Sequence, residues 1–302
     1  MKFKRIGVLY GGVSREREVS LAGGNAVAEA LEKGGFDVVR IDVSHELDRQ
    51  IRNAGIEAAF IVLHGRHGED GTVQGLLEMM QIPYTGSGVL ASALAIDKAR
   101  TRQILSDAGV LVARGVVFTA ENRDELPDGL QFPVVVKPAE EGSSVGVSIA
   151  KTPADFSDAL SEAFKCSRRI LVEEYIGGIE VQVAVLDNQV LGAVEVEPHN
   201  EFYDYAAKYE PGGSTHHIPP RLSAPRIEKV CAEGKKVFDA VGCAGAARVD
   251  FILTPDDRIY CLEINTIPGM TPTSLLPEIA AHAGMDFQQL VKTIAERATL
   301  HI

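Results

Sequence analysis

The sequence contains no tryptophan, only four cysteines and no long hydrophobic run. The cysteines, at positions 166, 231, 243 and 261, form neither a CxxC pair nor the spacing of a zinc site, so we expect reduced thiols. A membrane-spanning helix needs about 20 apolar residues, and no segment approaches that length. The apolar run after Met1 is also too short for the core of a signal peptide. These absences predict a cytoplasmic protein that makes no membrane contact.

Basic residues are also in the minority. Thirty Lys and Arg stand against 42 Asp and Glu, which gives a formal net charge of -12. This charge repels polyanions at long range, so a nucleic-acid partner is not expected. Any phosphate-binding site must therefore be built locally. With 45% hydrophobic residues, the 302-residue chain has the composition of a globular protein with two or three domains.

The first part of the chain alternates short β-branched runs with helical periodicity. Strands are expected at residues 6–10, 37–43 and 58–64, with an amphipathic helix between the first two. This alternation predicts a small parallel βαβ sheet with flanking helices.

A different order of elements begins near residue 97. A helix is expected to start at Asp97 or Lys98, and β-β-α-β follows. The three strands are expected at 132–138, 145–150 and 169–176, and the helix between the last two at 154–164. Two antiparallel hairpins come next, one turning at Asp187-Asn188 and one at Pro255-Asp256-Asp257.

These patterns predict a fold that combines α/β and α+β units. We expect three domains, at residues 1–96, 97–178 and 179–302. Residues 198–220 show no regular pattern but contain clustered aromatic side chains, including Tyr203, Tyr205 and Tyr209. Clustered aromatics favour a docking lid over a disordered segment.

The last hairpin carries opposed acidic residues. If its turn is centred on Asp256-Asp257, Asp250 faces Glu263, and Arg248 faces Asn265 on the same side. The opposite side is then a core face, formed by Val249, Phe251, Leu253, Tyr260, Leu262 and Ile264. Opposed carboxylates repel unless a cation or a proton intervenes, and with an Asn oxygen they suit Mg²⁺. A solvated face neutralised by Arg248 is an equal alternative from spacing alone.

Two lysines and one glycine-rich loop indicate phosphate binding. The loop EGSSVG (141–146) lies between two expected strands, where its amides and hydroxyls can close over a phosphate. Lys137 ends the strand before it, and Lys98 opens the preceding helix. No GxxxxGK[ST] motif occurs, which excludes a Walker A loop. The loop alone is more often a polar turn, but the lysines favour a site.

Weaker signals leave alternatives open. Gly11-Gly12 and residues 86–91 resemble parts of a dinucleotide loop, with Asp42 as a ribose partner, although the glycine spacing is incomplete. Glu173 and Glu180 are acceptors for adenine or ribose, or simply solvated carboxylates.

A histidine-containing loop precedes residue 71. His64 and His67 lie in a glycine-broken loop with Glu69 and Asp70, which favours substrate contact over a metal cluster.

Taken together, the residues resemble the ATP-grasp superfamily and, within it, the D-alanine–D-alanine ligase family. The resemblance covers essentially the whole chain. It rests on GGVSREREVSL (11–21), LHGRHGEDG (63–71), DKARTR (97–102), FPVVVKPAEEGSSVGV (132–147), EFYDYAAKY (201–209), RVDF (248–251) and LEINTIPGMTPTSLLP (262–277). It implies a three-domain ATP-grasp fold.

The resemblance also implies roles for individual residues. For ATP, it implies that Lys98 and Lys137 bind phosphates, Glu173 binds adenine, Glu180 binds ribose and Ser144 covers the transferred phosphate. For metal, it implies that Asp250, Glu263 and Asn265 bind two Mg²⁺ or Mn²⁺. For the first D-alanine, it implies Glu16 and His64, with Ser143 and Tyr209 tying the lid to Glu16. For the second D-alanine and the oxyanion, it implies Arg248, Gly269 and Ser274.

The implied reaction is ATP-dependent synthesis of D-alanyl-D-alanine through a D-alanyl phosphate, for peptidoglycan and the cell wall, by a homodimer. Ligases that use D-lactate or D-serine are the nearest alternative, and the EFYDYAAKY motif argues against them. A non-catalytic ATP sensor would not need Arg248 and Ser274. A nicotinamide-dependent enzyme is the least favoured alternative.

Overall fold

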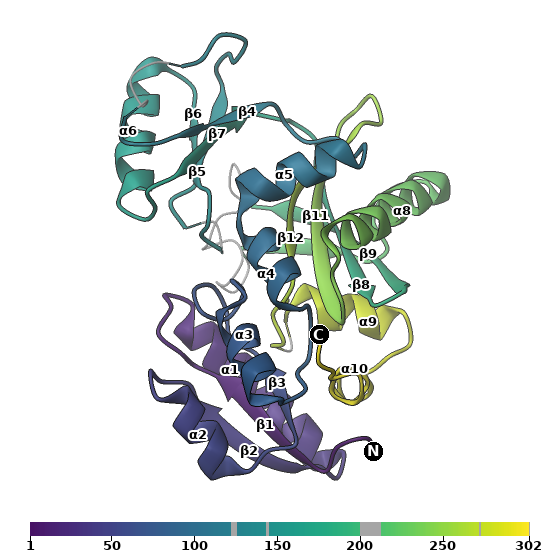
Figure 1. Ribbon diagram of the computed structural model, residues 1–302. Helices are drawn as coiled ribbons and strands as arrows, with labels where there is room; N and C mark the ends of the chain where they lie inside the picture. The colour runs from purple at the N-terminus through teal and green to yellow at the C-terminus, as the bar shows by residue number, and fades with distance from the viewer. Residues whose placement is uncertain (122–125, 143–144, 200–212, 272, 302) are drawn as a thin grey trace.

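The computed structural model describes residues 1–302 except 122–125, 143–144, 200–212, 272 and 302. The described strands form three sheets, with the orders β2-β1-β3, β4-β7-β5-β6 and β10-β9-β8-β11-β12. In Figure 1 the three-stranded sheet lies at one end of the molecule, the four-stranded sheet at the other end, and the five-stranded sheet beside the middle.

The N-terminal unit is the predicted parallel sheet with flanking helices. Its elements are β1 (Arg5–Tyr10), α1 (Arg17–Lys33), β2 (Asp37–Asp42), α2 (Leu47–Ala54), β3 (Ala58–Ile61) and α3 (Thr72–Met80). β1 pairs in parallel with both β2 and β3, which confirms the predicted topology. α1 packs closely on β1 at Gly24. The absence of a side chain at this position allows the approach, since a Cβ there would collide with Tyr10.

In the described residues, the middle of the chain forms three helices and the four-stranded sheet. Its elements are α4 (Val89–Ile96), α5 (Lys98–Asp107), β4 (Gly115–Phe118), β5 (Val134–Pro138), β6 (Ser148–Ala150), α6 (Pro153–Phe164) and β7 (Ile170–Glu174). The three expected strands and both expected helices are present; the strands are shorter than expected by two or three residues, and α6 begins one residue earlier. β4 was not predicted from its four residues. A capping box of Thr152 and Asp155 starts α6.

The part of the C-terminal region that the structure describes forms the five-stranded sheet and three helices. Its elements are β8 (Ile179–Leu186), β9 (Gln189–Pro198), β10 (Ser214–His217), α8 (Ala224–Val241), β11 (Ala246–Leu253), β12 (Ile259–Asn265), α9 (Leu275–His282) and α10 (Phe287–Glu296). Both predicted hairpins are confirmed. Strand β10 lies in the segment 198–220 that showed no regular pattern, and it pairs with β9.

The β11–β12 hairpin has the predicted register at its acidic end and a different register near its turn. Asp250 pairs with Glu263 and Arg248 with Asn265, as predicted, but a bulge after Asp250 pairs Phe251 with Cys261. The prediction that Leu262 belongs to the core face was therefore wrong. The bulge turns Leu262 toward a cavity, and the buried Cys261 takes its place in the core.

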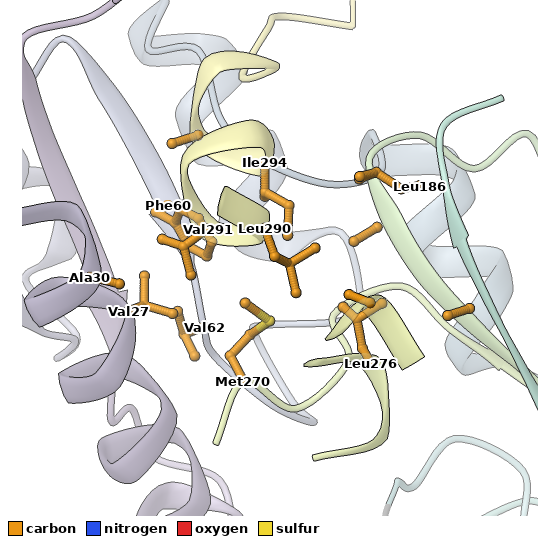
Figure 2. Close-up of a cluster of buried hydrophobic side chains, with 14 of the residues drawn as sticks. Val27, Ala30, Phe60, Val62, Leu186, Met270, Leu276, Leu290, Val291 and Ile294 are labelled. Carbon is orange, nitrogen blue, oxygen red and sulfur yellow. The ribbon is translucent and has the colours of Figure 1, made fainter. Parts of the chain in front are cut away.

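Packing joins segments that are far apart in the sequence. α10 packs against α1, and Figure 2 shows Val27, Leu290 and Ile294 meeting in one hydrophobic cluster with Met270 and Leu276. α4 and α5 add apolar side chains to the core of the five-stranded sheet. The division at residues 96 and 178 stays a prediction.

The sequence predicted neither disulfides nor membrane-spanning helices. All four cysteines are free thiols, as predicted. Of the helices that the structure describes, none combines the length and the apolar character needed to cross a bilayer.

Candidate active site

Two cavities meet at the hairpin of opposed acids. One, of about 540 Å³, lies between the N-terminal unit and the segment from β12 to α9. The other, of about 390 Å³, lies between the four-stranded and five-stranded sheets. Lys98 and Glu263 line both cavities. Groups bound in the two cavities therefore share one cation and one carboxylate at the junction.

All described residues to which the family resemblance gives a role line one or both of these cavities, whereas His67 and Asp70 of the expected substrate-contacting loop line neither. The larger cavity contains Glu16, His64, Arg248, Asn265, Gly269 and Ser274, and the smaller contains Lys137, Glu173, Glu180 and Asp250. Ser143, Ser144 and Tyr209 lie outside the described residues. The predicted set thus forms one continuous site from three sheets.

Of the opposed acids, Asp250 is buried and Glu263 is partly buried, and each is bound by a cation. Asp250 is 2% exposed, and Arg248 donates to its two oxygens from Nε and Nη2, both at 2.8 Å. Lys98 Nζ lies 3.2 Å from Glu263 Oε2. Asn265 Oδ1 accepts a hydrogen bond from the Ile267 amide at 2.9 Å, which fixes its orientation. Two carboxylates and an amide oxygen at one cavity junction form a hard oxygen donor set that suits Mg²⁺ or Mn²⁺.

The smaller cavity has a cationic end and an apolar middle. Lys137 forms an ion pair with the buried Glu173, which also lies 3.1 Å from Arg102 Nη1. The apolar walls of the smaller cavity include Val135, Ile149, Ile176, Ile252 and Leu262. This combination of buried lysine and apolar walls suits a nucleotide, whose base is flat and whose phosphates are charged.

The other end of the smaller cavity is acidic. Glu180 accepts a hydrogen bond from Gln182 Nε2 at 2.9 Å, and Glu195 is bound by Arg221 at 2.6 Å. Both glutamates line the cavity. Glu195 and Arg221 were not identified from the sequence, since their pairing joins β9 to the loop after β10.

The helix that begins at Lys98 is fixed at its N-terminus. Asp97 accepts from the Arg100 amide at 3.0 Å and pairs with Arg169 at 2.7 Å. Lys98 Nζ also donates to the backbone oxygen of Glu141 at 2.7 Å. The cap and these contacts hold the lysine at the cavity junction.

Glu16 lies at the N-terminus of α1, enclosed by two glycine loops. It is 7% exposed, and a Cβ at Gly65 or Gly142 would lie 2.7 Å or 3.1 Å from its Oε2. Glycine at these two positions is what lets the loops approach the carboxylate.

His64 contributes a buried polar atom without a partner. Among the described residues, nothing hydrogen-bonds to its Nε2. Burial, together with the charge of Arg248, lowers the pKa of His64 to about 4. The ring is therefore neutral near pH 7 and keeps an unused hydrogen-bonding atom at the larger cavity.

Glu69 is a further buried carboxylate of the larger cavity, which the sequence placed only in the expected substrate-contacting loop. Its Oε2 accepts from the Gly65 amide at 2.6 Å. Burial and the charge of nearby Glu16 raise the pKa of Glu69 to about 8. Glu69 belongs to the LHGRHGEDG motif, so the sequence drew attention to it, but the burial of its side chain arises only in the folded chain.

The dinucleotide alternative fails at Asp42. Arg17 binds both oxygens of this carboxylate, at 2.7 Å and 2.6 Å. The acid expected to bind a ribose is therefore already paired, and neither large cavity includes Gly11.

The fold and the two joined cavities define the class: this is an ATP-grasp protein. Comparison with known proteins identifies the family within this class. The families described as D-ala D-ala ligase N-terminus and D-ala D-ala ligase C-terminus match residues 43–87 and 104–296. The chain belongs to the D-alanine–D-alanine ligase family, which confirms the resemblance seen in the sequence.

Relatives and solved structures agree over the full length. D-alanine–D-alanine ligases of Geotalea uraniireducens and Geobacter sulfurreducens are 51% and 50% identical, covering 100% of this chain and 98% and 96% of theirs. The crystal structure of D-alanine–D-alanine ligase from Bacillus anthracis has a TM-score of 0.87 at 36% identity, covering 97% of this chain and 96% of that one. The VanG D-Ala:D-Ser ligase from Enterococcus faecalis has a TM-score of 0.85 at 31% identity, covering 97% and 98%.

The neutral His64 makes the stability of the chain sensitive to acid. An unfolded histidine, with its pKa near 6.5, takes up a proton more readily than the buried ring, so this contribution is complete above pH 6.5 and is lost as the pH falls toward 4. The shift corresponds to about 3 kcal/mol. We expect His64→Gln to flatten the decrease in unfolding free energy over this range, measured by urea denaturation at each pH. His45→Gln, at an exposed site, is the control, and equal acid sensitivity in both variants contradicts the assignment.

Proposed function

We propose that this protein joins two D-alanine molecules into D-alanyl-D-alanine and converts ATP to ADP and phosphate. The observation that carries the proposal is the meeting of the two cavities at Lys98 and Glu263. A phosphoryl donor in one cavity and a carboxylate acceptor in the other come together at that point. The product is a peptidoglycan precursor, and we place its synthesis in the cytoplasm.

In the first step, a carboxylate oxygen of the first D-alanine attacks the terminal phosphorus of ATP. The new oxygen–phosphorus bond gives D-alanyl phosphate as the bond to ADP breaks. Lys98 and Lys137 bind the phosphates, Glu173 lies toward the adenine and Glu180 toward the ribose. The activated acyl group is formed where the larger cavity begins.

Asp250, Glu263 and Asn265 would hold two Mg²⁺ or Mn²⁺ beside the phosphates. These ions would neutralise charge on the phosphoryl oxygens. The support for this assignment is the donor set itself, two acids and an amide oxygen on paired positions of one hairpin.

In the second step, the amine of the second D-alanine attacks the acyl carbon and displaces phosphate. Arg248 and the Gly269 amide stabilise the tetrahedral oxyanion, and Ser274 binds the carboxylate of the second D-alanine. Glu16 binds the ammonium of the first D-alanine, and His64 lies near its carboxylate.

Ser143, Ser144 and Tyr209 complete the proposed site. Ser144 covers the transferred phosphate, and Ser143 and Tyr209 connect the lid to Glu16. A closed lid protects the acyl phosphate from water.

Substrate choice is the direct test of the activity. We expect ADP and phosphate to be released with ATP, Mg²⁺ and D-alanine, and not with L-alanine, because Glu16 and His64 are proposed to bind the ammonium and carboxylate of the D-enantiomer. Adding D-lactate or D-serine as the second substrate, with product identified by mass spectrometry, tests the alternative acceptors. Equal turnover with both alanine enantiomers contradicts the proposal.

Asp250 tests the metal site. We expect Asp250→Asn to lower turnover by roughly 100-fold, since it removes a charged ligand, and to leave the chain folded because the amide oxygen still accepts from Arg248. Turnover and the Mg²⁺-dependent shift of the melting temperature by ATP are measured together. Asp256→Asn, at the exposed turn of the same hairpin, is the matched control. Full activity and an undiminished Mg²⁺-dependent shift in the Asp250 variant argue against the metal role.

We also propose that the protein is a homodimer. Met79 on α3 and Leu90 on α4 are 88% and 71% exposed, and these helices pack side by side. An exposed apolar surface of this kind favours burial in an interface. We expect Leu90→Asp to convert a dimer into a monomer in light scattering. A monomeric unmodified chain is the contrary result.

A further inference from the structure

Ser274 is the N-cap residue of helix α9, but its hydroxyl does not cap the helix. A serine at the N-cap ordinarily accepts a hydrogen bond from the amide at N2 or N3. Here its side chain makes no such bond. The N3 position is Pro277, which has no amide hydrogen to donate. The hydroxyl of Ser274 is therefore free of the usual capping role.

Instead, Ser274 is bound closely by Thr271. The Thr271 amide donates to Ser274 Oγ at 3.1 Å, and the two hydroxyl oxygens lie 2.7 Å apart. The Ser274 amide in turn donates to the Thr271 backbone oxygen at 3.0 Å. Thr271 thus contacts both the backbone and the side chain of Ser274.

A serine hydroxyl has one proton and two acceptor sites. The Thr271 amide fills one acceptor site. If the Thr271 hydroxyl donates to the other, the Ser274 proton has no remaining role toward Thr271 and points elsewhere. Gly269 lies directly against Ser274 Oγ, which is possible because glycine has no Cβ; a Cβ there would lie only 2.7 Å from that oxygen.

The open direction is the larger cavity, which Ser274, Thr271 and Gly269 all line. Thr273 Oγ1 lies 3.4 Å from Thr271 Oγ1, where it can donate and so leave the Thr271 proton for Ser274. Such a chain of hydroxyls polarises each member in the same direction.

We infer that Thr271 is a positioning residue that directs the Ser274 O–H into the cavity, toward the carboxylate of the second amino acid. The inference rests on the proposed function, which places that carboxylate at Ser274. The inference predicts that the Thr271 hydroxyl strengthens binding of the second D-alanine and does not affect binding of ATP or of the first D-alanine.

The test is a double-mutant cycle of Thr271 and Ser274. We expect Thr271→Val, which keeps the amide and the shape, to raise the KM for the second D-alanine by about fivefold to tenfold, the range of one lost hydrogen bond. The KM for ATP, the KM for the first D-alanine and kcat change less than twofold. Thr271→Ser, which keeps the hydroxyl, restores the KM. In a Ser274→Ala background, Thr271→Val has no further effect.

Thr293→Val is the matched control. The Thr293 hydroxyl donates to the Gln289 backbone oxygen on α10, and Thr293 lines neither cavity. Circular dichroism and melting temperature are recorded for each variant, and Thr271→Ala replaces the valine variant if that one is unfolded. An unchanged second KM, additive effects in the cycle, or parallel changes in all kinetic constants overturn the inference. An unmodified chain that forms no dipeptide overturns the proposed function instead, so the two failures are distinguishable.

Discussion

The pairing of two carboxylates across β11 and β12 sets the position of the whole site. Asp250 and Glu263 face one another on adjacent strands, where like charges repel strongly. Arg248 and Lys98 offset that repulsion, at 2.8 Å and 3.2 Å. Because one acid faces the smaller cavity and the other lies at the junction, the hairpin fixes where both cavities meet.

The larger cavity depends on a second constraint, the packing of the two ends of the chain. Glu16 and His64 come from the N-terminal unit, while Gly269 and Ser274 follow β12. The cluster that contains Val27 and Leu290 joins these parts (Figure 2). Each such side chain contributes about 1.5–3 kcal/mol when fully buried. Apolar burial therefore keeps the polar walls of the cavity at a fixed separation.

Local patterns were sufficient for the strands of the N-terminal sheet, for both hairpins and for the register at the acidic end of the second hairpin, but not for the short strands β4 and β10. Alternation and a turn sequence determine which residues face one another over a few positions, so the pairing of Asp250 with Glu263 was predictable. The bulge was not, because Leu262 fits an apolar cavity wall as well as a core. The raised pKa of Glu69 was also invisible, since it arises from burial and from Glu16, which is brought close only by the fold.

The same reasoning explains how a chain with a net charge of -12 can form a phosphate site. The buried cations are already matched: Lys137 and Arg102 pair with Glu173, Lys98 with Glu263, and Arg248 with Asp250. These pairs offset part of the cost of burying the charged side chains. A polyphosphate alone would bring further negative charge next to Asp250 and Glu263. Divalent ions at Asp250 and Glu263 would cancel that excess and release the cations toward the phosphates, so the opposed acids and the lysines act as one electrostatic unit.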